Sequence, residues 1–382
     1  MRILMITGVQ GKAEAGVAGI VYNLARQLAD FGHTVKPLFL EDLLPTQKWP
    51  NRFRTTEFAR SAALYVAQHR DEYDVVNIHA PFGFWYGARR RRLGAKAGPP
   101  YVMTMHGLEE RRMYAMGREA KKGHADYYRW RNRVWQNIYH MPTYRYSATT
   151  ADQSIVTNRE TLVYLQLHYD LAPDRVWFVA NGVGPEFFLP RTFSAGRATK
   201  LLFVGTWIDH KGVYYLAHAF DQILTAFPDT RLTVAGCIVP EAEVRRHFSS
   251  AAQSALTVIP FVSRAEISRL YFGHEIFVLP SLMEGMPLVL LEAMASGLPV
   301  ITTESCGMTD LIEDGRDGLF VVPGNTGSLV SAILTLCQDA ALRRRLGEAA
   351  QEKMKRYSWT ETAKRSEAVF ARALEMGKGN LA

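Results

Sequence analysis

The sequence predicts an α/β protein made of two doubly wound, Rossmann-like parallel-sheet domains that face each other across a cleft. Short β-branched runs alternate with helical patterns along the whole chain, as is typical of a parallel sheet covered by helices on both faces. The alternation pauses at a Gly- and Pro-containing junction, residues 181–185, and a second series begins near Lys200. The 382 residues are enough for two domains of ordinary size.

The first half of the chain contains six predicted strands, at residues 3–7, 34–40, 74–79, 101–107, 153–157 and 176–179. Residues 17–31 read as a helix, because Ile20, Leu24 and Leu28 recur on one face and Gly32 ends the pattern. The apolar run at the start of the chain is too short for a signal peptide, so we interpret it as the first buried strand.

The second half repeats this organisation. Strands are predicted at residues 201–205, 231–236, 276–279, 299–303 and 318–322, with helices at 213–227, 288–296 and 360–376. In open parallel sheets, ligands bind beyond the carboxyl ends of the strands. The predicted site therefore lies on loops that follow strands.

Composition points to a soluble protein. The longest apolar runs, such as residues 276–279, have the length of a strand and are too short to span a membrane. Cys237, Cys306 and Cys337 are widely spaced and form neither a metal pattern nor a disulfide framework, which favours a reducing cytoplasm and three core thiols.

The net charge of +8 is concentrated in one segment. Residues 89–145 contain fourteen Lys and Arg against four acidic residues, so this segment carries +10 and the rest of the chain −2. Such a segment attracts phosphates, anionic lipid or nucleic acid. No nucleic-acid recognition motif is present, so we expect no nucleic-acid partner.

The stretch at residues 280–297 is the most informative part of the sequence. A buried strand ends at Pro280, a loop carries Glu284, Gly285 and Met286, and Pro287 is expected as the first helical residue, before Leu288. A strand–loop–helix junction favours an anion at the helix N-terminus. Glu284 and Glu292 can accept hydrogen bonds from paired hydroxyl groups. By spacing alone, Glu284 could equally be a cap and Glu292 a solvated helix residue.

This stretch, followed by residues 299–303 and 315–319, resembles the Glu-x7-Glu signature of the family 4 retaining glycosyltransferases, which have the GT-B fold. Residues 203–212 resemble the phosphate-binding loop of that family. Lys211 is present, whereas Thr206 occupies the usual Arg position, and Gly205 opens the loop. The resemblance thus leaves one diphosphate-binding cation where the family commonly has two.

Other segments extend the resemblance along the chain. Residues 15–19 are similar to the N-terminal Gly-Gly loop, in which Ala15 replaces the first Gly and Gly16 keeps the second. His106 corresponds to the His beside the donor sugar, and His79 is a candidate acceptor-side residue. An ordinary strand-to-helix turn and structural histidines are the alternatives. Residues 357–359 resemble the point where the family's last helix returns to the first domain. The implied domains are 1–185, 186–356 and 357–382.

The resemblance implies transfer of a hexosyl group from a nucleoside diphosphate sugar to a hydroxyl group, with the anomeric configuration retained. The expected catalytic residues are Glu284, His106 and Lys211. The expected donor-binding set is Gly16, Gly205, Thr206, Lys211, Glu284, Gly285, Met286, Pro287, Leu288, Glu292 and, near the base, Val262. No Asp-x-Asp element is present, so no metal and no cofactor besides the sugar nucleotide is expected. The alternatives are a non-catalytic sugar-nucleotide-binding protein and an epimerase.

The acceptor is expected to be a saccharide or a lipid-linked molecule used in cell-surface glycan synthesis. Arg89 and Arg90, in a run of four arginines, are candidate acceptor-side residues. Aromatic residues accompany the cations at 111–146, a composition that suits contact with an anionic membrane surface at the inner face of the cell membrane. Plain burial of the aromatic side chains against a neighbouring helix would give the same composition.

Overall fold

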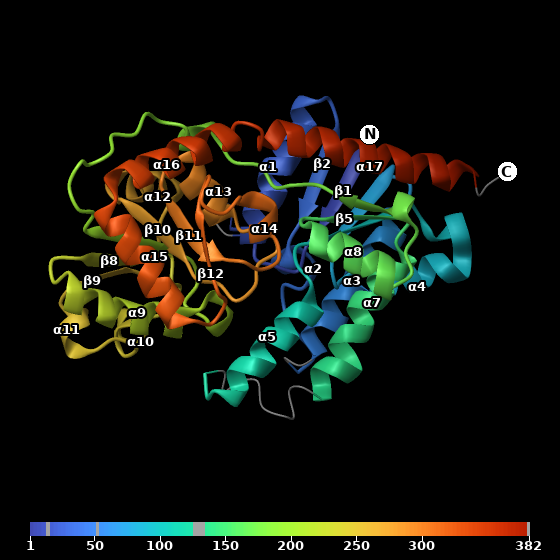
Figure 1. Ribbon diagram of the computed structural model, residues 1–382. Coiled ribbons are helices and arrows are strands. Elements are labelled where there is room, and N and C mark those ends of the chain that lie inside the picture. Colours follow the sequence, from blue (N-terminus) through green and yellow to red (C-terminus); the bar gives the residue numbers. More distant parts are fainter. Residues whose placement is uncertain (13–15, 51–52, 125–133, 380–382) are drawn as a thin grey trace. The chain divides into compact units, whose positions relative to one another are not determined.

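The computed structural model describes residues 1–12, 16–50, 53–124 and 134–379 (Figure 1). Within these residues the chain divides into two compact units. Unit 1 comprises the described residues within Met1–Glu110, Arg129–Asn181 and Trp359–Ala382, and unit 2 comprises those within Arg111–Tyr128 and Gly182–Ser358. Each unit contains one six-stranded sheet in which every described strand pair is parallel. The predicted fold class, with two Rossmann-like parallel-sheet domains, is confirmed.

Unit 1 has the strand order β2-β1-β3-β4-β5-β6. Its strands are β1 (Arg2–Ile6), β2 (Thr34–Leu38), β3 (Val75–His79), β4 (Tyr101–Met105), β5 (Gln153–Val156) and β6 (Val176–Phe178). Its helices are α1 (Gly16–Asp30), α2 (Leu40–Leu43), α3 (Arg54–Gln68), α4 (Phe84–Leu93), α7 (Met141–Thr150), α8 (Arg159–His168) and α17 (Trp359–Gly379).

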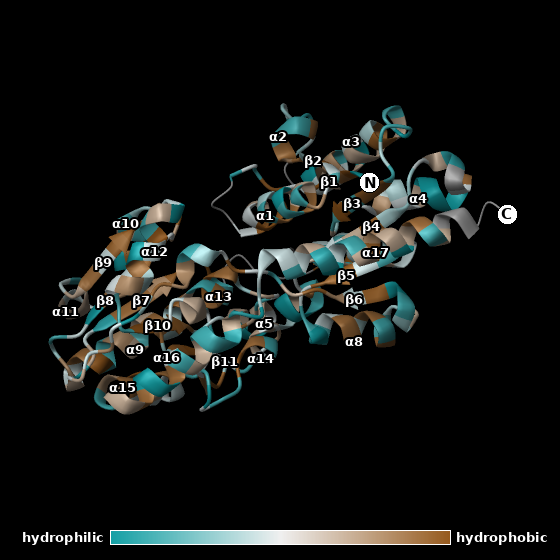
Figure 2. Ribbon diagram, turned by 90° about the horizontal axis from the view of Figure 1, so that it is seen from above, coloured by the Kyte–Doolittle hydropathy of each residue, from teal (hydrophilic) through white to brown (hydrophobic). Residues whose placement is uncertain are grey.

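The core of unit 1 covers both faces of its sheet, which explains why β1 is apolar at consecutive positions. Ile3 and Met5 pack in one cluster with residues of α1 and α17, whereas Leu4 and Ile6 pack in a second cluster with residues of α3. Side chains alternate between faces along a strand, so a strand covered on both faces must be apolar throughout. Figure 2 shows hydrophobic residues in brown along strands such as β1 and β3, and a mixture of teal and brown residues along the surrounding helices.

Unit 2 has the strand order β12-β11-β10-β7-β8-β9. Its strands are β7 (Lys200–Val204), β8 (Arg231–Ala235), β9 (Leu256–Ile259), β10 (Ile276–Leu279), β11 (Val300–Thr303) and β12 (Leu319–Val321). Its helices are α9 (Val213–Ala226), α10 (Glu241–Arg245), α11 (Ser250–Gln253), α12 (Arg264–Gly273), α13 (Leu288–Ala295), α14 (Met308–Leu311), α15 (Thr326–Gln338) and α16 (Ala340–Met354). Counted from β7, this is the 3-2-1-4-5-6 order of dinucleotide-binding Rossmann domains.

Helix α5 (Glu109–Lys121) follows β4 in the sequence, and the contacts of its later residues place them in unit 2. The buried carboxylate of Glu119 accepts hydrogen bonds from the Tyr215 hydroxyl at 2.6 Å and from Lys122 Nζ at 3.1 Å. Lys122 also donates to the Tyr215 hydroxyl at 2.7 Å. These hydrogen bonds attach the end of α5 to the first turn of α9.

The predicted strands agree with the structure to within two residues at each end. Strand β9 was not predicted, and of the described helices only α1, α9, α13 and α17 were. Two of the three free cysteines are fully buried, and Cys306 is nearly so. Among the described helices, none combines the length and the apolar character needed to cross a lipid bilayer.

Candidate functional site

Two charged side chains meet where the strand order of unit 2 reverses, between β7 and β10. Lys211 lies on the loop after β7, and Glu284 on the loop after β10. Lys211 Nζ is 2.5 Å from Glu284 Oε1, and their side chains are only 15% and 12% exposed. The crevice at such a reversal is where sheets of this kind bind ligands. The pair therefore occupies the position where a ligand site is expected.

The backbone around this ion pair is fixed by close contacts. Gly212 has a φ of +72°, and a Cβ atom there would lie 2.0 Å from the carbonyl oxygen of Pro280. The Leu282 amide donates to the His210 carbonyl at 2.7 Å, which joins the two loops. The Ser281 hydroxyl donates to Glu284 Oε1 at 2.9 Å. Both charged groups are thus positioned before any ligand arrives.

The loop after β7 leaves space for the lysine. Gly205 has a φ of +147°, and a Cβ atom there would lie 3.8 Å from Lys211 Cε. Thr206 follows on the same loop, half-buried, and its carbonyl accepts from the Ile208 amide at 3.0 Å. The Thr206 side chain is neutral, so it adds no second positive charge beside Lys211.

A cation that the sequence did not associate with this site lies nearby. Burial lowers the pKa of His210 to about 4, while Glu284 opposes that shift and Lys211 and Arg112 reinforce it. Arg112 therefore lies within electrostatic range of His210. It is half-buried on α5 and shares a helix face with Glu119, since the two are seven residues apart. In the sequence, Arg112 stands out only as one of the cations of the basic segment at residues 89–145.

The loop before α13 is also held closely. The Gly307 amide donates to the Glu284 carbonyl at 3.1 Å, and a Cβ atom on Gly307 would lie 1.4 Å from the Gly285 carbonyl oxygen. Met286 and Pro287 are buried, and Leu288 is half-buried. The expectation that Pro287 is the first helical residue is wrong. With a ψ of 119° it is the N-cap, and its carbonyl accepts the first hydrogen bonds of the helix.

Glu292 lies in the second turn of α13 and is not a solvated helix residue. Its Oε2 is 3.0 Å from the hydroxyl of the fully buried Tyr271, on α12. Burial raises the pKa of Glu292 to about 7, while the hydrogen bond from Tyr271 works in the opposite direction. Tyr271 was missed by sequence reasoning because a single apolar-looking Tyr in a helix carries no motif. Val262 lies half-buried just before α12.

Unit 1 brings two predicted residues together. His79 is the last residue of β3 and His106 directly follows β4, its neighbour in the sheet. His106 Nε2 lies 2.9 Å from His79 Nδ1. Burial lowers the pKa of His79 well below its usual value, and it lowers the pKa of His106 to about 4. Both rings are therefore neutral at pH 7.

The remaining predicted residues of unit 1 are dispersed. Gly16 begins α1 with a φ of +29°, and a Cβ atom there would contact nothing within 4 Å. Ala15 lies outside the described residues, as do the basic and aromatic residues at 125–133.

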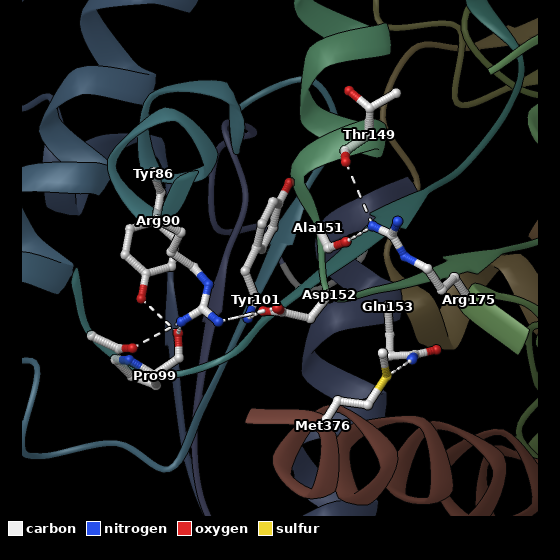
Figure 3. Close-up of polar contacts among 11 residues, drawn as sticks. Tyr86, Arg90, Pro99, Tyr101, Thr149, Ala151, Asp152, Gln153, Arg175 and Met376 are labelled. Atoms are coloured by element: carbon white, nitrogen blue, oxygen red, sulfur yellow. Dashed lines mark hydrogen bonds and ion pairs between the residues drawn. The ribbon is translucent and has the colours of Figure 1, made fainter. Parts of the chain in front are cut away.

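Arg90 is engaged at the amino edge of the sheet, away from the histidine pair. Its guanidinium donates to the carbonyls of Gly98 and Pro99 and pairs with Asp152 at 3.0 Å, as Figure 3 shows for Pro99 and Asp152. Asp152 also accepts from the amide of Tyr101, the first residue of β4. Arg89 Nε is buried, with no hydrogen-bond partner among the described residues. These contacts give Arg90 a structural role, and they do not support its predicted acceptor role.

Two family models match the chain one after the other. The model for Glycosyltransferase Family 4 matches residues 15–187, and the model for glycosyl transferases group 1 matches residues 188–353. An uncharacterised glycosyltransferase of Methanocaldococcus jannaschii is 25% identical over 325 residues, which cover 80% of this chain and 77% of that protein. A D-inositol 3-phosphate glycosyltransferase of Corynebacterium glutamicum is 28% identical over 242 residues, which cover 59% of this chain and 58% of that protein.

Solved structures share the fold over nearly the whole chain. The sucrose-phosphate synthase of Thermosynechococcus elongatus superposes with a TM-score of 0.79 at 19% identity, covering 98% of this chain and all of that one. The Anabaena protein HepE, solved with UDP and glucose, has a TM-score of 0.69 at 15% identity, covering 97% of this chain and 99% of that one.

Proposed function

Because the chain belongs to the family 4 glycosyltransferases of group 1, and is therefore a transferase, we propose that it moves a hexosyl group from a nucleoside diphosphate sugar to a hydroxyl group with retention of configuration. The observation that carries this proposal is the Lys211–Glu284 ion pair at the strand-order reversal of unit 2. HepE, a structural neighbour, was solved with UDP and glucose, which supports a sugar nucleotide as the donor.

The ion pair provides the two kinds of group that a sugar nucleotide needs. When the donor enters, its diphosphate takes Glu284's place as the partner of Lys211, and the carboxylate becomes available to the hydroxyl groups of the sugar. Bond cleavage places growing negative charge on the leaving diphosphate. A half-buried lysine and the N-terminus of α13 stabilise that charge more strongly than water would.

Glu292 is suited to the ribose of the donor. Its carboxylate is held by Tyr271 on one oxygen, which leaves the second oxygen to accept from a ribose hydroxyl. The base would lie near Val262, where backbone groups at the start of α12 are available. His106 would contact the sugar or the phosphate. The acceptor proton goes to the leaving phosphate on the same face of the sugar, so the reaction needs no protein nucleophile.

The acceptor is proposed to be a saccharide or a lipid-linked molecule in cell-surface glycan synthesis, reached from the inner face of the membrane. The support is the end of α4, where Arg91 and Arg92 are exposed. Trp85 and Leu93 on the same helix are 42% and 39% exposed. Exposed cations beside exposed apolar side chains suit an anionic lipid surface.

The experiment is a thermal-shift screen against uridine and guanosine diphosphate sugars, followed by a transfer assay with the donor that binds. A ligand of the folded state raises the melting temperature. We expect Glu284→Ala to lower kcat about 100-fold or more without unfolding the protein. Glu313→Ala, at an exposed acidic residue of unit 2, should leave kcat unchanged.

The products distinguish the remaining possibilities. NMR of the product should show the anomeric configuration of the donor. Wild-type kcat in Glu284→Ala would contradict the assignment of the site. Isomerised donor without transfer would point to an epimerase, and binding without turnover would point to a non-catalytic protein.

A further inference from the structure

One buried nitrogen of the histidine pair in unit 1 has no hydrogen-bond partner among the described residues. His79 is 2% exposed, and its ring centroid lies 4.7 Å from that of His106. His106 Nε2 contacts His79 Nδ1, but His106 Nδ1 is buried and has no hydrogen-bond partner in the part of the chain that the structure describes. A buried polar atom without a partner costs about 1–3 kcal/mol, so it is normally retained for a reason.

The position of the pair follows from the sheet. His79 is in register with Thr104 on the neighbouring strand, and His106 lies two residues beyond Thr104. Side chains two residues apart share a face of a strand, so both rings lie on the same face at the carboxyl edge. This edge is where open parallel sheets present the groups that act on ligands.

The hydrogen bond between the two rings couples their protons. Each neutral ring carries one N–H group, and the contact between them needs one N–H and one lone pair. Either both rings carry the proton on Nε2, or both carry it on Nδ1. In the first case His106 Nδ1 accepts a hydrogen bond, and in the second it donates one. The state of His79 therefore decides what His106 offers to a ligand.

We infer that His79 is the positioning residue of His106. His79 Nδ1 accepts a hydrogen bond from His106 Nε2–H, and this bond orients the His106 ring. His106 Nδ1 is then left as a hydrogen-bond acceptor for a hydroxyl group of the transferred sugar. Neutral imidazole in water prefers the proton on Nε2, and this arrangement gives both rings that preferred form. The inference rests on the proposed function and gives His79 a role different from binding the acceptor directly.

The test replaces His79 in two ways. His79→Leu removes the acceptor atom, whereas His79→Asn keeps an amide oxygen close to where Nδ1 lies. We expect His79→Leu to lower kcat about 10- to 100-fold, because His106 loses its orientation, with the donor dissociation constant within about twofold of wild type. His79→Asn should recover most of kcat. His69→Leu, at a histidine whose ring contacts Tyr65 in the preceding turn of α3, is the matched control and should behave as wild type.

A second measurement does not depend on activity. Nitrogen-15 NMR of labelled histidine reports which ring nitrogen carries the proton, and the signals of His106 are assigned by their loss in His106→Asn. We expect a protonated Nε2 in wild type and in His79→Asn, and a mixture of the two forms in His79→Leu. Melting temperatures confirm that each variant is folded.

The outcomes separate this inference from the proposed function. Unchanged His106 signals in folded His79→Leu would overturn the inference. A raised acceptor KM with unchanged kcat would also overturn it, since that result assigns His79 to the acceptor. If wild type transfers no sugar, the proposed function fails, and the NMR comparison still decides whether His79 positions His106.

Discussion

Glu292, proposed to bind the ribose of the donor, carries a cost for the stability of the folded protein. Its pKa is raised from 4.5 to about 7 by burial. Between pH 4.5 and about 7, the Glu292 carboxyl is protonated in the folded protein but ionised in the unfolded chain. The free energy of unfolding therefore falls as the pH rises through this range. At pH 8 we expect Glu292→Gln to melt several degrees above wild type, because its free energy of unfolding is higher by on the order of 2 kcal/mol. At pH 4.5 the two proteins should differ little.

Thermal denaturation at the two pH values measures this effect. Glu313→Gln is the control, because the Glu313 side chain is 61% exposed. If Glu292→Gln differed from wild type in stability by the same amount at both pH values, the raised pKa of Glu292 would not be the cause. The same variant should bind the donor more weakly, because an amide is a poorer acceptor for ribose hydroxyl groups than a carboxylate.

At the same scale, Arg112 is a second candidate cation for the donor diphosphate, because Thr206 adds no positive charge beside Lys211. Arg112 is half-buried and within electrostatic range of His210, next to Lys211. We expect Arg112→Ala to raise the donor dissociation constant about 10-fold, because a cation near a diphosphate in a partly buried site is worth roughly 1–2 kcal/mol. Isothermal titration calorimetry measures the change in the donor dissociation constant. Arg118→Ala, at an exposed arginine of the same helix, should bind like wild type.

At the scale of elements, the site depends on how closely the two loops of unit 2 approach each other. Gly212 has a positive φ, and a Cβ atom on it would lie 2.0 Å from the Pro280 carbonyl oxygen, where no side chain fits. Gly315 has almost the same φ, +71°, but open space around it. We expect Gly315→Ala to cost about 1 kcal/mol of stability and Gly212→Ala several times more, with loss of donor binding.

Chemical denaturation of the two glycine variants separates backbone strain from steric overlap. If both variants lose the same stability, the contact with Pro280 does not hold the loop. Donor binding measured at a temperature where both variants remain folded shows whether Lys211 has moved.

At the scale of the whole molecule, the sequence predicted the fold because a strand buried on both faces must be apolar throughout. The strands of the candidate site were all recognisable for this reason. Strand β9, a four-residue strand at the edge of its sheet, was not predicted. The Glu284 and Lys211 positions follow from motifs. Tyr271, Arg112 and the contact between His79 and His106 depend on packing between distant segments, which no local pattern encodes.

The proposed peripheral membrane contact belongs to the scale of the whole protein. The structure refines its test, because Arg90 is bonded to Pro99 and Asp152 whereas Arg91 and Arg92 are exposed. We expect Arg91→Ser with Arg92→Ser to reduce flotation with anionic vesicles several-fold, at about 1 kcal/mol per cation. Arg344→Ser with Arg356→Ser removes the same charge from exposed positions of unit 2. Equal flotation of the two double variants would exclude the end of α4 as the contact.

The return of α17 to unit 1 determines the order in which the protein can be completed during synthesis. Ala363, Val369, Phe370 and Ala373 are part of the same core cluster as Ile3 and Met5. The ribosome has therefore released all of unit 2 before the last helix of unit 1 is available. The part of this sheet face that α17 covers stays exposed throughout that time, so the half of the protein that is made first is the half that finishes folding last.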